Sequence, residues 1–502
     1  AICLLFSYLD PSHEQRLADR LREELPGVHV SASHEVLPQF REYERCSTTV
    51  IDAYLSPLLG RYLGRLAEAA GDRGLPEPQV MQSSGGVAPA AEAARAGAWS
   101  VLSGPAGGAV GAGLIARASG GGDALGLDMG GTSCDVCVVE GGRVRRTDSR
   151  TIDGRPIQLP MVDVHTVGAG GGSIAWRDPG GALRVGPRSA GAEPGPAAYG
   201  RGGAEPTVTD ANLALGYLSA DSSLAGGVDL DTEAASAALR RLGDELGMDD
   251  EATAAGIVRV ANHEMVRALR VVTIERGIDP RGFALMPFGG AGPMHAAGIA
   301  TELDISRLLC PRASGVLSAL GLLASERRRD VTKTVSMREL DAERIADAIA
   351  ELAAQVSQGL EGAAIEVVCE MRYRGQAFEL AVPASERPDP ADLTEEFGKQ
   401  HEERYGYRDD AAPVELINLR VAAVVPGPEP RPRAAAEGGL ERTTRRAWFD
   451  GEWRDAEVLR GEPPAGLEAG GPCVFELPEA TLVLPPGWSA AVDDAGTVIA
   501  SR

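Results

Sequence analysis

The stretch GLDMGGTSCDVCVVEGG spans residues 126–142 and predicts a strand, a tight turn and a second strand. The apolar run ALGLD leads into GGTS, and DVCVVEGGRVRRT then folds back on itself through Gly141 and Gly142. Two chemistries fit this stretch. It is either a phosphate-binding turn built around the paired glycines, or a redox or metal site built on its CxxC spacing.

The phosphate interpretation rests on five residues of the turn. Gly130 and Gly131 remove side chains where a phosphate must approach the backbone, and they expose N–H groups to it. Thr132 adds a hydroxyl for the same oxygens, and Asp128 and Asp135 are candidate catalytic residues that can hold Mg²⁺ directly or through water. A plain glycine-rich hairpin has the same pattern, so the rest of the chain must decide.

The cysteine interpretation rests on Cys134 and Cys137. A redox CxxC normally lies at a helix start, where the dipole lowers the thiol pKa, whereas this one lies in an alternating strand. Zinc would need two further ligands, and the sequence offers no second CxxC and no HxxxH pair. The pattern therefore favours two incidental strand cysteines.

A second glycine-rich loop, VGAGGGSIAW (167–176), follows a predicted strand. Its candidate nucleotide-binding residues are Gly168, Gly170, Gly171, Gly172 and Ser173. His165 lies just before the loop and is a third candidate catalytic residue, able to contact substrate or phosphate. A structural histidine that only makes hydrogen bonds is the alternative at this position.

A third loop, FGGAGPMHA (288–296), follows the predicted strand FALMPF and opens a helix. Free N–H groups and the positive end of the helix dipole can face an anion or the adenosine part of a nucleotide there. Its candidate residues are Gly289, Gly290 and Gly292, with His295 just inside the helix. Three such loops, each following an apolar strand, favour a nucleotide cleft.

Composition restricts the remaining choices. The chain has 502 residues, long enough for several domains, and its formal charge of −23 argues against nucleic-acid binding, which needs a basic surface. ATP remains possible because backbone N–H groups and one metal ion can balance its charge locally.

Seven scattered cysteines do not resemble a disulfide framework, so we expect a reduced, cytoplasmic setting. The apolar opening AICLLFSYLD and the run GVLSALGLLA are too short to cross a bilayer. We therefore expect no membrane association.

The N-terminal region is predicted to alternate strands and helices, which is typical of an α/β protein. Residues 1–9 predict a buried strand and VHVSAS (28–33) a second strand. Residues 12–25 between them predict an amphipathic helix with Ser12 as N-cap and a buried face of Leu17, Leu21 and Leu25.

A longer helix is predicted over about residues 45–70. Pro57 lies inside it and should kink or divide it. The helix carries apolar and aromatic residues at four-residue spacing, namely Val50, Tyr54, Leu58 and Tyr62.

Several segments carry a resemblance to a known family. They include EVLPQFREYERCSTTVIDAYLSPLLGRYL, MQSSGGV, SGPAGGAVGA, LDMGGTSCDV, VDVHTVGAGGGSIA, SAGAEPGPAAYGRGGAEPTVTDANLALG, FGGAGPMHA, SGVLSALGLL, HEERYGYRD and LPPGW. With them the chain resembles the A-type (α) subunit of the ATP-dependent hydantoinase/5-oxoprolinase family over nearly its whole length.

The resemblance implies an actin/hexokinase/Hsp70-like ATPase core, in which two RNase-H-like halves close over ATP. It implies that residues 1–120 hold the remainder of the first half, residues 121–332 the second half with its phosphate and adenosine loops, and residues 333–502 a C-terminal α+β to β-rich domain. On this reading Asp128–Asp135 is the phosphate hairpin and Gly289–Gly292 belongs to the adenosine side.

The chain departs from the family pattern at two places. Family members usually carry another D-x-G-G-T turn well upstream of LLFSY, and this sequence does not show it, so we expect an N-terminal segment to be missing. That expectation puts independent ATPase activity in doubt. Cys134 also stands where the family more often has a small hydroxyl residue.

The family's activity implies ATP- and Mg²⁺-dependent ring opening of a cyclic amide such as a hydantoin or 5-oxoproline. It further implies a separate B-type partner subunit in a hetero-oligomer. Two alternatives remain, namely the ATP-binding subunit of an acetone- or acetophenone-type carboxylase and a non-catalytic assembly subunit.

Overall fold

The computed structural model describes residues 1–120, 122–220, 229–430 and 439–502. The chain forms two compact units, each assembled from three separate stretches. Unit 1 comprises residues 1–106, 146–162 and 325–428, and unit 2 comprises residues 107–145, 163–324 and 429–502. These units divide the molecule in space, and the three-part division along the sequence stays a prediction.

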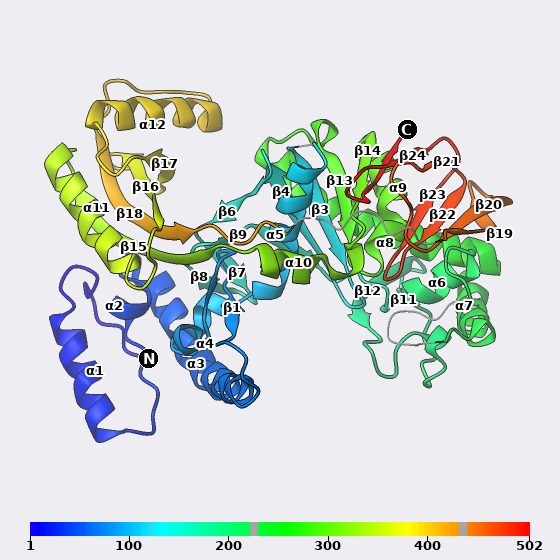
Figure 1. Ribbon diagram of the computed structural model, residues 1–502, viewed down its shortest axis with the longest axis horizontal. Helices are drawn as coiled ribbons and strands as arrows, with labels where there is room; N and C mark the ends of the chain where they lie inside the picture. Colours follow the sequence, from blue (N-terminus) through cyan, green and yellow to red (C-terminus); the bar gives the residue numbers. More distant parts are fainter. Residues whose placement is uncertain (121, 221–228, 431–438) are drawn as a thin grey trace. The chain divides into compact units, whose positions relative to one another are not determined.

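A nine-stranded sheet forms the centre of unit 2 (Figure 1). Along its main path the strands follow the order β10 (Val164–Val167), β4 (Cys134–Glu140), β3 (Ala124–Met129), β13 (Ala284–Phe288), β14 (Arg307–Cys310), β25 (Val498–Ser501), β24 (Ser489–Val492) and β21 (Glu468–Gly470). β5 (Arg143–Val144) pairs with β4 through the predicted turn at Gly141 and Gly142. β4 runs antiparallel to both of its neighbours, β3 and β10, whereas β13 runs parallel to β3 and β14 parallel to β13.

Helices pack on both faces of this sheet, because successive strand side chains point to opposite sides. On one face, Leu125, Leu127 and Val136 share a core with residues of α6 (Val208–Ala214), α8 (Asp250–Val272) and α9 (Gly292–Glu302). On the other face, Ala124 and Met286 pack with residues of α5 (Ser103–Ala118) and α10 (Leu317–Ala324). The predicted α/β class is therefore confirmed.

Glycines bring α5 and α10 into close contact. A Cβ atom on Gly321 of α10 would lie 1.9 Å from the carbonyl oxygen of Gly107 and 2.6 Å from the backbone nitrogen of Gly111, both on α5. The small residues of SGPAGGAVGA are thus needed for helix packing, in addition to any role near a ligand.

The C-terminal strands belong to the same core. β19 (Glu441–Phe449), β20 (Glu452–Arg460), β22 (Cys473–Glu476) and β23 (Thr481–Leu484) form a four-stranded sheet, coloured orange to red in Figure 1. Leu459, Phe475 and Leu482 from it pack in the core that also contains Ala297 of α9.

Unit 1 contains a six-stranded sheet in the order β1 (Gln79–Met81), β2 (Val87–Pro89), β15 (Arg327–Met337), β18 (Val414–Val425), β16 (Ala364–Tyr373) and β17 (Leu380–Ala384). Figure 1 shows the long antiparallel pair β15 and β18 side by side. Ile345 and Leu352 of α11 (Ala342–Val356) and Phe397 of α12 (Pro390–Tyr405) bury their side chains against this sheet's residues.

The predicted strands at the N-terminus are wrong. Residues 1–9 form a turn instead of a strand. Among the described residues, the only β-pairing of this segment is an isolated bridge between Ile2 and Ala32. The same bridge is the only β-structure in the strand predicted at 28–33. The helix α1 (Ser12–Glu24) is present, but its N-cap is Pro11 rather than Ser12. It buries Glu14 and Ala18, and the predicted leucine face of Leu17, Leu21 and Leu25 leaves Leu17 and Leu25 exposed.

The helix α3 (Glu42–Gly71) is also present and continues through Pro57 without dividing. The residues at four-residue spacing, Val50, Tyr54, Leu58 and Tyr62, are all exposed. The buried face is polar instead. Asp52 accepts a hydrogen bond from the N–H of Ala98 at 3.1 Å, and Ser56 one from Gly97 at 2.9 Å. The buried backbone N–H groups of Gly97 and Ala98 need hydrogen-bond acceptors. The polar face of α3 supplies these acceptors, so this face of the helix is the buried one.

Among the described helices, none is both long enough and apolar enough to span a membrane.

Substituting Gly321 with alanine should lower the free energy of unfolding by about 3 kcal/mol, because the new methyl group would overlap the α5 backbone. Gly64→Ala on α3 is the control: nothing lies within 4 Å of its Cβ position, so helix propensity should raise stability by up to about 1 kcal/mol. Urea unfolding followed by circular dichroism measures both. Equal stability of the two variants would contradict the close packing of α5 and α10.

Candidate functional site

The turn between β3 and β4 projects from the end of the unit 2 sheet. The N–H of Gly130 donates to the carbonyl oxygen of Ser133 at 3.1 Å, which closes the turn. Gly131 and Thr132 are exposed, and their backbone N–H groups have no hydrogen-bond acceptor among the described residues. A Cβ atom on Gly130 or Gly131 would meet nothing within 4 Å. The turn therefore offers two free donors beside open space.

The two candidate carboxylates lie at the base of this turn. Asp128 and Asp135 are directly opposite each other in the antiparallel register of β3 and β4. Burial, and next the charge of Asp135, raise the pKa of Asp128 to about 6, although a hydrogen bond from Ser318 opposes the rise. Asp135 accepts a hydrogen bond from the Thr166 hydroxyl at 2.6 Å. The strands thus hold two acidic groups on one face of the sheet.

His165 does not join them. In the register of β10 and β4 it pairs with Val136, while its neighbour Thr166 pairs with Asp135. Because adjacent residues of a strand point to opposite faces, the His165 side chain lies on the other face of the sheet from both carboxylates. Its catalytic role stays a prediction that this placement does not favour.

The second loop packs directly on the turn. The N–H of Gly171 donates to the carbonyl of Gly130 at 2.9 Å, and the N–H of Gly172 donates to that of Gly131 at 2.7 Å. A Cβ atom on Gly170 would lie 2.6 Å from the backbone nitrogen of Thr132, so only glycine permits this approach.

Ser173 holds the second loop in shape. Its hydroxyl oxygen accepts from the N–H of Gly170 at 2.8 Å and lies 3.4 Å from the carbonyl oxygen of Gly168. Both hydrogen bonds lie within the loop, so Gly168 and Ser173 help to fix the conformation of the loop.

The third loop reaches the same place from β13. Gly289 has φ +76°, and a Cβ atom there would lie 2.4 Å from Asp128 Oδ1. The N–H of Ala291 donates to the carbonyl of Met129 at 3.0 Å, and Gly292 is the first residue of α9. The backbone N–H of Gly290 has no acceptor within the described part of the chain.

A cavity of about 380 Å³ lies where these loops meet. Gly130, Gly131, Gly171 and Gly290 line it, so each of the three predicted loops contributes to its wall. The other predicted residues, including Asp128 and Asp135, do not line it.

Sequence reasoning missed the rest of the wall. Tyr199 and Thr209 line the cavity, and the Thr209 hydroxyl donates to the carbonyl of Gly171 at 2.9 Å. Thr207 and Asp210 form a capping box at the start of α6, a signal that marks this helix start in the sequence. Residues 476–481 also line the cavity, but no local sequence signal marks them. They reach the wall because they join β22 and β23 of the C-terminal sheet.

The remaining cysteine and histidine candidates are structural. Cys134 and Cys137 are buried on opposite faces of β4, and burial raises the pKa of both thiols, that of Cys137 to about 12. Within the described ranges, no group of three or more His, Cys, Asp and Glu side chains is placed to hold a metal ion. His295 is buried between Asn262 and Asn212, and burial lowers its pKa to about 4.

Comparisons with known proteins agree over the whole chain. The caprolactamase subunit alpha of Pseudomonas jessenii is 39% identical, covering 99% of this chain and 75% of that protein. The 5-oxoprolinase of Saccharomyces cerevisiae is 32% identical, covering 98% of this chain and 41% of that protein.

Two solved structures are similar as well. The crystal structure of the ATP-dependent caprolactamase from Pseudomonas jessenii matches with a TM-score of 0.86 and 37% identity, covering 100% of this chain and 76% of that one. The nucleotide-free structure of acetone carboxylase matches with a TM-score of 0.79 and 26% identity, covering 99% of this chain and 75% of that one.

The family described as "Hydantoinase/oxoprolinase" matches residues 45–331, and the "Hydantoinase/oxoprolinase C-terminal domain" matches residues 332–498. With its loops, its sheet and its relatives in agreement, this chain belongs to the hydantoinase/oxoprolinase family.

Proposed function

We propose that this chain is the ATP-binding subunit of an amidohydrolase that opens the ring of a cyclic amide such as a hydantoin or 5-oxoproline. The observation that carries the proposal is the meeting of three glycine-rich loops around one cavity, with free backbone donors at Gly131, Thr132 and Gly290. The ATP-dependent caprolactamase, to which the chain is similar over its full length, supports the same class of reaction.

The proposed fold is an actin/hexokinase/Hsp70-like core. Three consecutive antiparallel strands (β3, β4 and β10) followed by two parallel ones (β13 and β14) have the strand order of one RNase-H-like half. This order supports assigning residues 121–332 to the second half. The assignment of residues 1–120 to the remainder of the first half and of residues 333–502 to a C-terminal domain stays a prediction.

In the proposed complex the β3–β4 turn binds the phosphates of ATP. The N–H groups of Gly131 and Thr132 donate to phosphate oxygens, and the Thr132 hydroxyl adds a third donor. Gly289, Gly290 and Gly292 form the adenosine side, where the apolar side chains of Leu218, Met294 and Leu477 line the cavity and suit the face of a purine base.

Asp128 and Asp135 fit the Mg²⁺ that accompanies ATP. They are hard oxygen ligands held opposite each other, and the charge of Asp135 helps to raise the pKa of Asp128, a repulsion that a bound cation relieves. When bound, Mg²⁺ supplies charge neutralisation at the transferring phosphate. The two carboxylates would hold it directly or through water.

The proposed reaction begins with attack of the amide carbonyl oxygen on the γ-phosphorus, which releases ADP. Water then adds to the activated carbon, and the ring C–N bond breaks with proton transfer to nitrogen, which leaves an acyl phosphate. A second water hydrolyses the acyl phosphate to the carboxylate and inorganic phosphate. The chain contributes by positioning the γ-phosphate and by donating hydrogen bonds to it. We propose that a B-type subunit completes the enzyme in a hetero-oligomer, as the name "subunit alpha" of its relative suggests.

A carboxylase subunit is the second candidate, because the acetone carboxylase structure is also similar over nearly the whole chain. Such an enzyme would use ATP to activate a ketone and bicarbonate. Measuring ATP hydrolysis with each substrate set distinguishes the two.

Gly170 and Gly131 provide a matched pair for the nucleotide site. Gly170→Ala should separate the second loop from the turn, lowering both the melting temperature and nucleotide affinity. Gly131→Ala has space for its methyl group, so it should keep the wild-type melting temperature but weaken nucleotide binding at least about tenfold, or about 1.4 kcal/mol. Thermal unfolding and calorimetric titration with ADP and ATP check both. Wild-type affinity of a stable Gly131→Ala variant would contradict phosphate binding by the turn.

Asp128→Asn should lower kcat for amide-dependent ATP hydrolysis by about 10²-fold or more, because it removes a charge from the phosphate site while keeping the side-chain shape. Asp123→Asn, at the residue just before β3, is the matched control and should leave kcat unchanged. The assay uses the complete chain with its B-type partner and compares hydantoins, 5-oxoproline, and ketone plus bicarbonate. ATP turnover that depends on none of these compounds would overturn the proposal and favour a non-catalytic assembly subunit.

A further inference from the structure

The motif SGVLSALGLL (314–323) contacts the proposed nucleotide site in unit 2 without lining its cavity. It forms the short 3-10 helix η5 (Ser314–Val316) and most of α10. The carbonyl oxygen of Ser314 accepts a hydrogen bond from the N–H of Gly289 at 2.8 Å, which ties the motif to the third glycine loop. This motif therefore supports the site in addition to the contacts among the three loops.

A side chain of α10 also reaches the site. The hydroxyl of Ser318, which is half-buried, donates a hydrogen bond to the Asp128 carboxylate. A Cβ atom built on Gly108 would lie 3.0 Å from Ser318 Oγ and 3.2 Å from Asp128 Oδ2, so these two atoms approach the same point. Ser318 thus lies on the Oδ2 side of the carboxylate.

Glycines of α5 make this contact possible. Alanine in place of Gly108 would put a methyl carbon within 3.2 Å of both polar atoms. A Cβ atom on Gly107 would lie 3.0 Å from the carbonyl oxygen of Ser318, and Gly321 lies one turn further along the same face of α10. Only residues without a Cβ atom allow two helices to approach so closely. The packing of α5 against α10 therefore brings the Ser318 hydroxyl to Asp128.

The two oxygens of Asp128 have different surroundings. Oδ1 faces the third loop, because a Cβ atom on Gly289 would lie 2.4 Å from it, whereas Oδ2 lies on the Ser318 side. The χ2 torsion of an aspartate is broad, so a carboxylate without restraint samples many orientations. A hydrogen bond to one oxygen restricts this rotation and fixes the direction of the other lone pairs. A fixed direction matters for Mg²⁺, which demands near-octahedral geometry.

The second carboxylate of the pair has a hydroxyl partner of its own. Asp135 Oδ1 accepts a hydrogen bond from the Thr166 hydroxyl at 2.6 Å. Thr166 is exposed, whereas Ser318 is half-buried and less open to competition from water. Hydroxyl groups from β10 and α10 therefore restrain the two carboxylates, and the restraint on Asp128 is the better shielded one.

We propose that Ser318 is a positioning residue, which fixes the Asp128 carboxylate for the divalent cation that accompanies ATP. This role rests on the proposed function, which assigns Asp128 to that cation. Ser318 lies outside the cavity wall and acts through Asp128. Its loss should therefore weaken binding of the nucleotide with its cation and spare the metal-free nucleotide. Hydrogen-bond partners of metal ligands typically contribute about 10- to 100-fold to metal affinity or activity.

Calorimetric titration of the complete chain with ADP, once with excess Mg²⁺ and once with EDTA, separates these two effects. Ser318→Ala should weaken ADP binding about tenfold with Mg²⁺ and leave ADP binding in EDTA within about twofold of the wild type. Ser318→Cys keeps nearly the same side-chain size but donates weakly, so it should show the same loss. A loss shared by both variants identifies the hydrogen bond, rather than the side-chain volume, as its cause.

Ser119→Ala is the matched control, because Ser119 Oγ also donates to an aspartate of unit 2, Asp493, at 3.1 Å. Neither residue lines the nucleotide cavity, so ADP binding should match the wild type with and without Mg²⁺. Thermal unfolding should show that all three variants are folded at the temperature of the titration.

Steady-state kinetics with the B-type partner present give a second measurement. Ser318→Ala should raise the Mg²⁺ concentration for half-maximal amide-dependent ATP hydrolysis about tenfold, and saturating Mg²⁺ should restore most of kcat. A general structural defect would instead lower kcat at every Mg²⁺ concentration.

Wild-type affinity for ADP with Mg²⁺ in either Ser318 variant would overturn the positioning role, while nucleotide binding by the wild type would still support the proposed function. Equal losses of ADP affinity with Mg²⁺ and in EDTA would overturn the positioning role as well, because they would indicate a structural one. Failure of the wild-type chain to bind ADP or ATP under either condition would contradict the proposed function itself.

Discussion

The geometry of the candidate nucleotide site depends on one backbone contact, between the second glycine loop and the β3–β4 turn. The N–H groups of Gly171 and Gly172 donate to the carbonyls of Gly130 and Gly131, which fixes the turn from one side. Because those carbonyls are occupied, the turn is held with the N–H groups of Gly131 and Thr132 directed away from protein partners in the described structure. The contact exists only because Gly170 has no Cβ atom.

The same crowding surrounds Asp128. A Cβ atom on Gly289 would lie 2.4 Å from its Oδ1, and one on Gly108 would lie 3.2 Å from its Oδ2. Gly289 and Gly108, on two separate segments, therefore leave room for the Asp128 carboxylate. Asp128 also lies opposite Asp135 in the strand pair. A site of this kind concentrates negative charge beside backbone donors, which suits a complex of phosphate and divalent cation.

The parts of the fold that sequence predicts well are those with local causes. Paired glycines after an apolar strand predict the turn at Gly130 and Gly131, and alternation predicts the strands beside it. The exposure of Tyr54 and Tyr62 on α3 could not be predicted in this way. Periodicity identifies an apolar stripe but not which face covers buried backbone groups, and Asp52 and Ser56 decide that through contacts with residues far along the chain.

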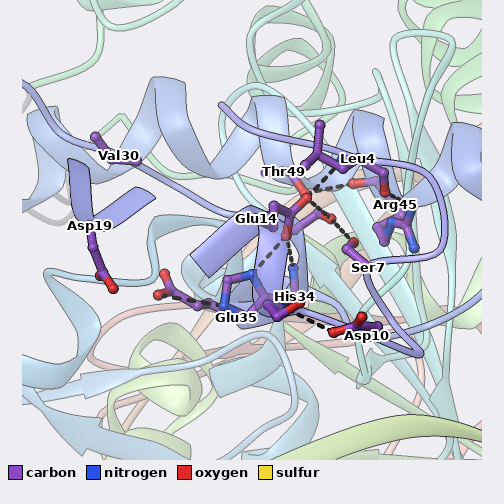
Figure 2. A network of polar contacts seen from close by, with 12 residues as sticks. Leu4, Ser7, Asp10, Glu14, Asp19, Val30, His34, Glu35, Arg45 and Thr49 are labelled. Carbon is purple, nitrogen blue, oxygen red and sulfur yellow. Dashed lines mark hydrogen bonds and ion pairs between the residues drawn. The ribbon is translucent and has the colours of Figure 1, made fainter. Parts of the chain in front are cut away.

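The residues of the candidate sites also differ in whether local sequence or long-range packing places them. Glycines of the three loops are visible in the sequence, but the wall formed by residues 476–481 depends on how a distant sheet packs. The carboxylate–imidazole pair of Glu14 and His34 in unit 1 (Figure 2) was equally hidden, because the two residues are 20 positions apart on different helices. Leucine spacing predicted an apolar inner face for α1, whereas the buried Glu14 accepts hydrogen bonds there from Leu4, Ser33 and His34.

The position of β25 has a consequence for how the molecule is made. Residues 498–501 form an inner strand of the unit 2 sheet, hydrogen-bonded to β14 on one side and β24 on the other. During synthesis the sheet therefore keeps an open edge at β14 until residues 498–501 have left the ribosome. Pairing of segments so far apart in the sequence closes a long loop, which slows folding and prolongs the exposure of that edge. The pairing of residues 498–501 thus sets the time at which the sheet can be completed.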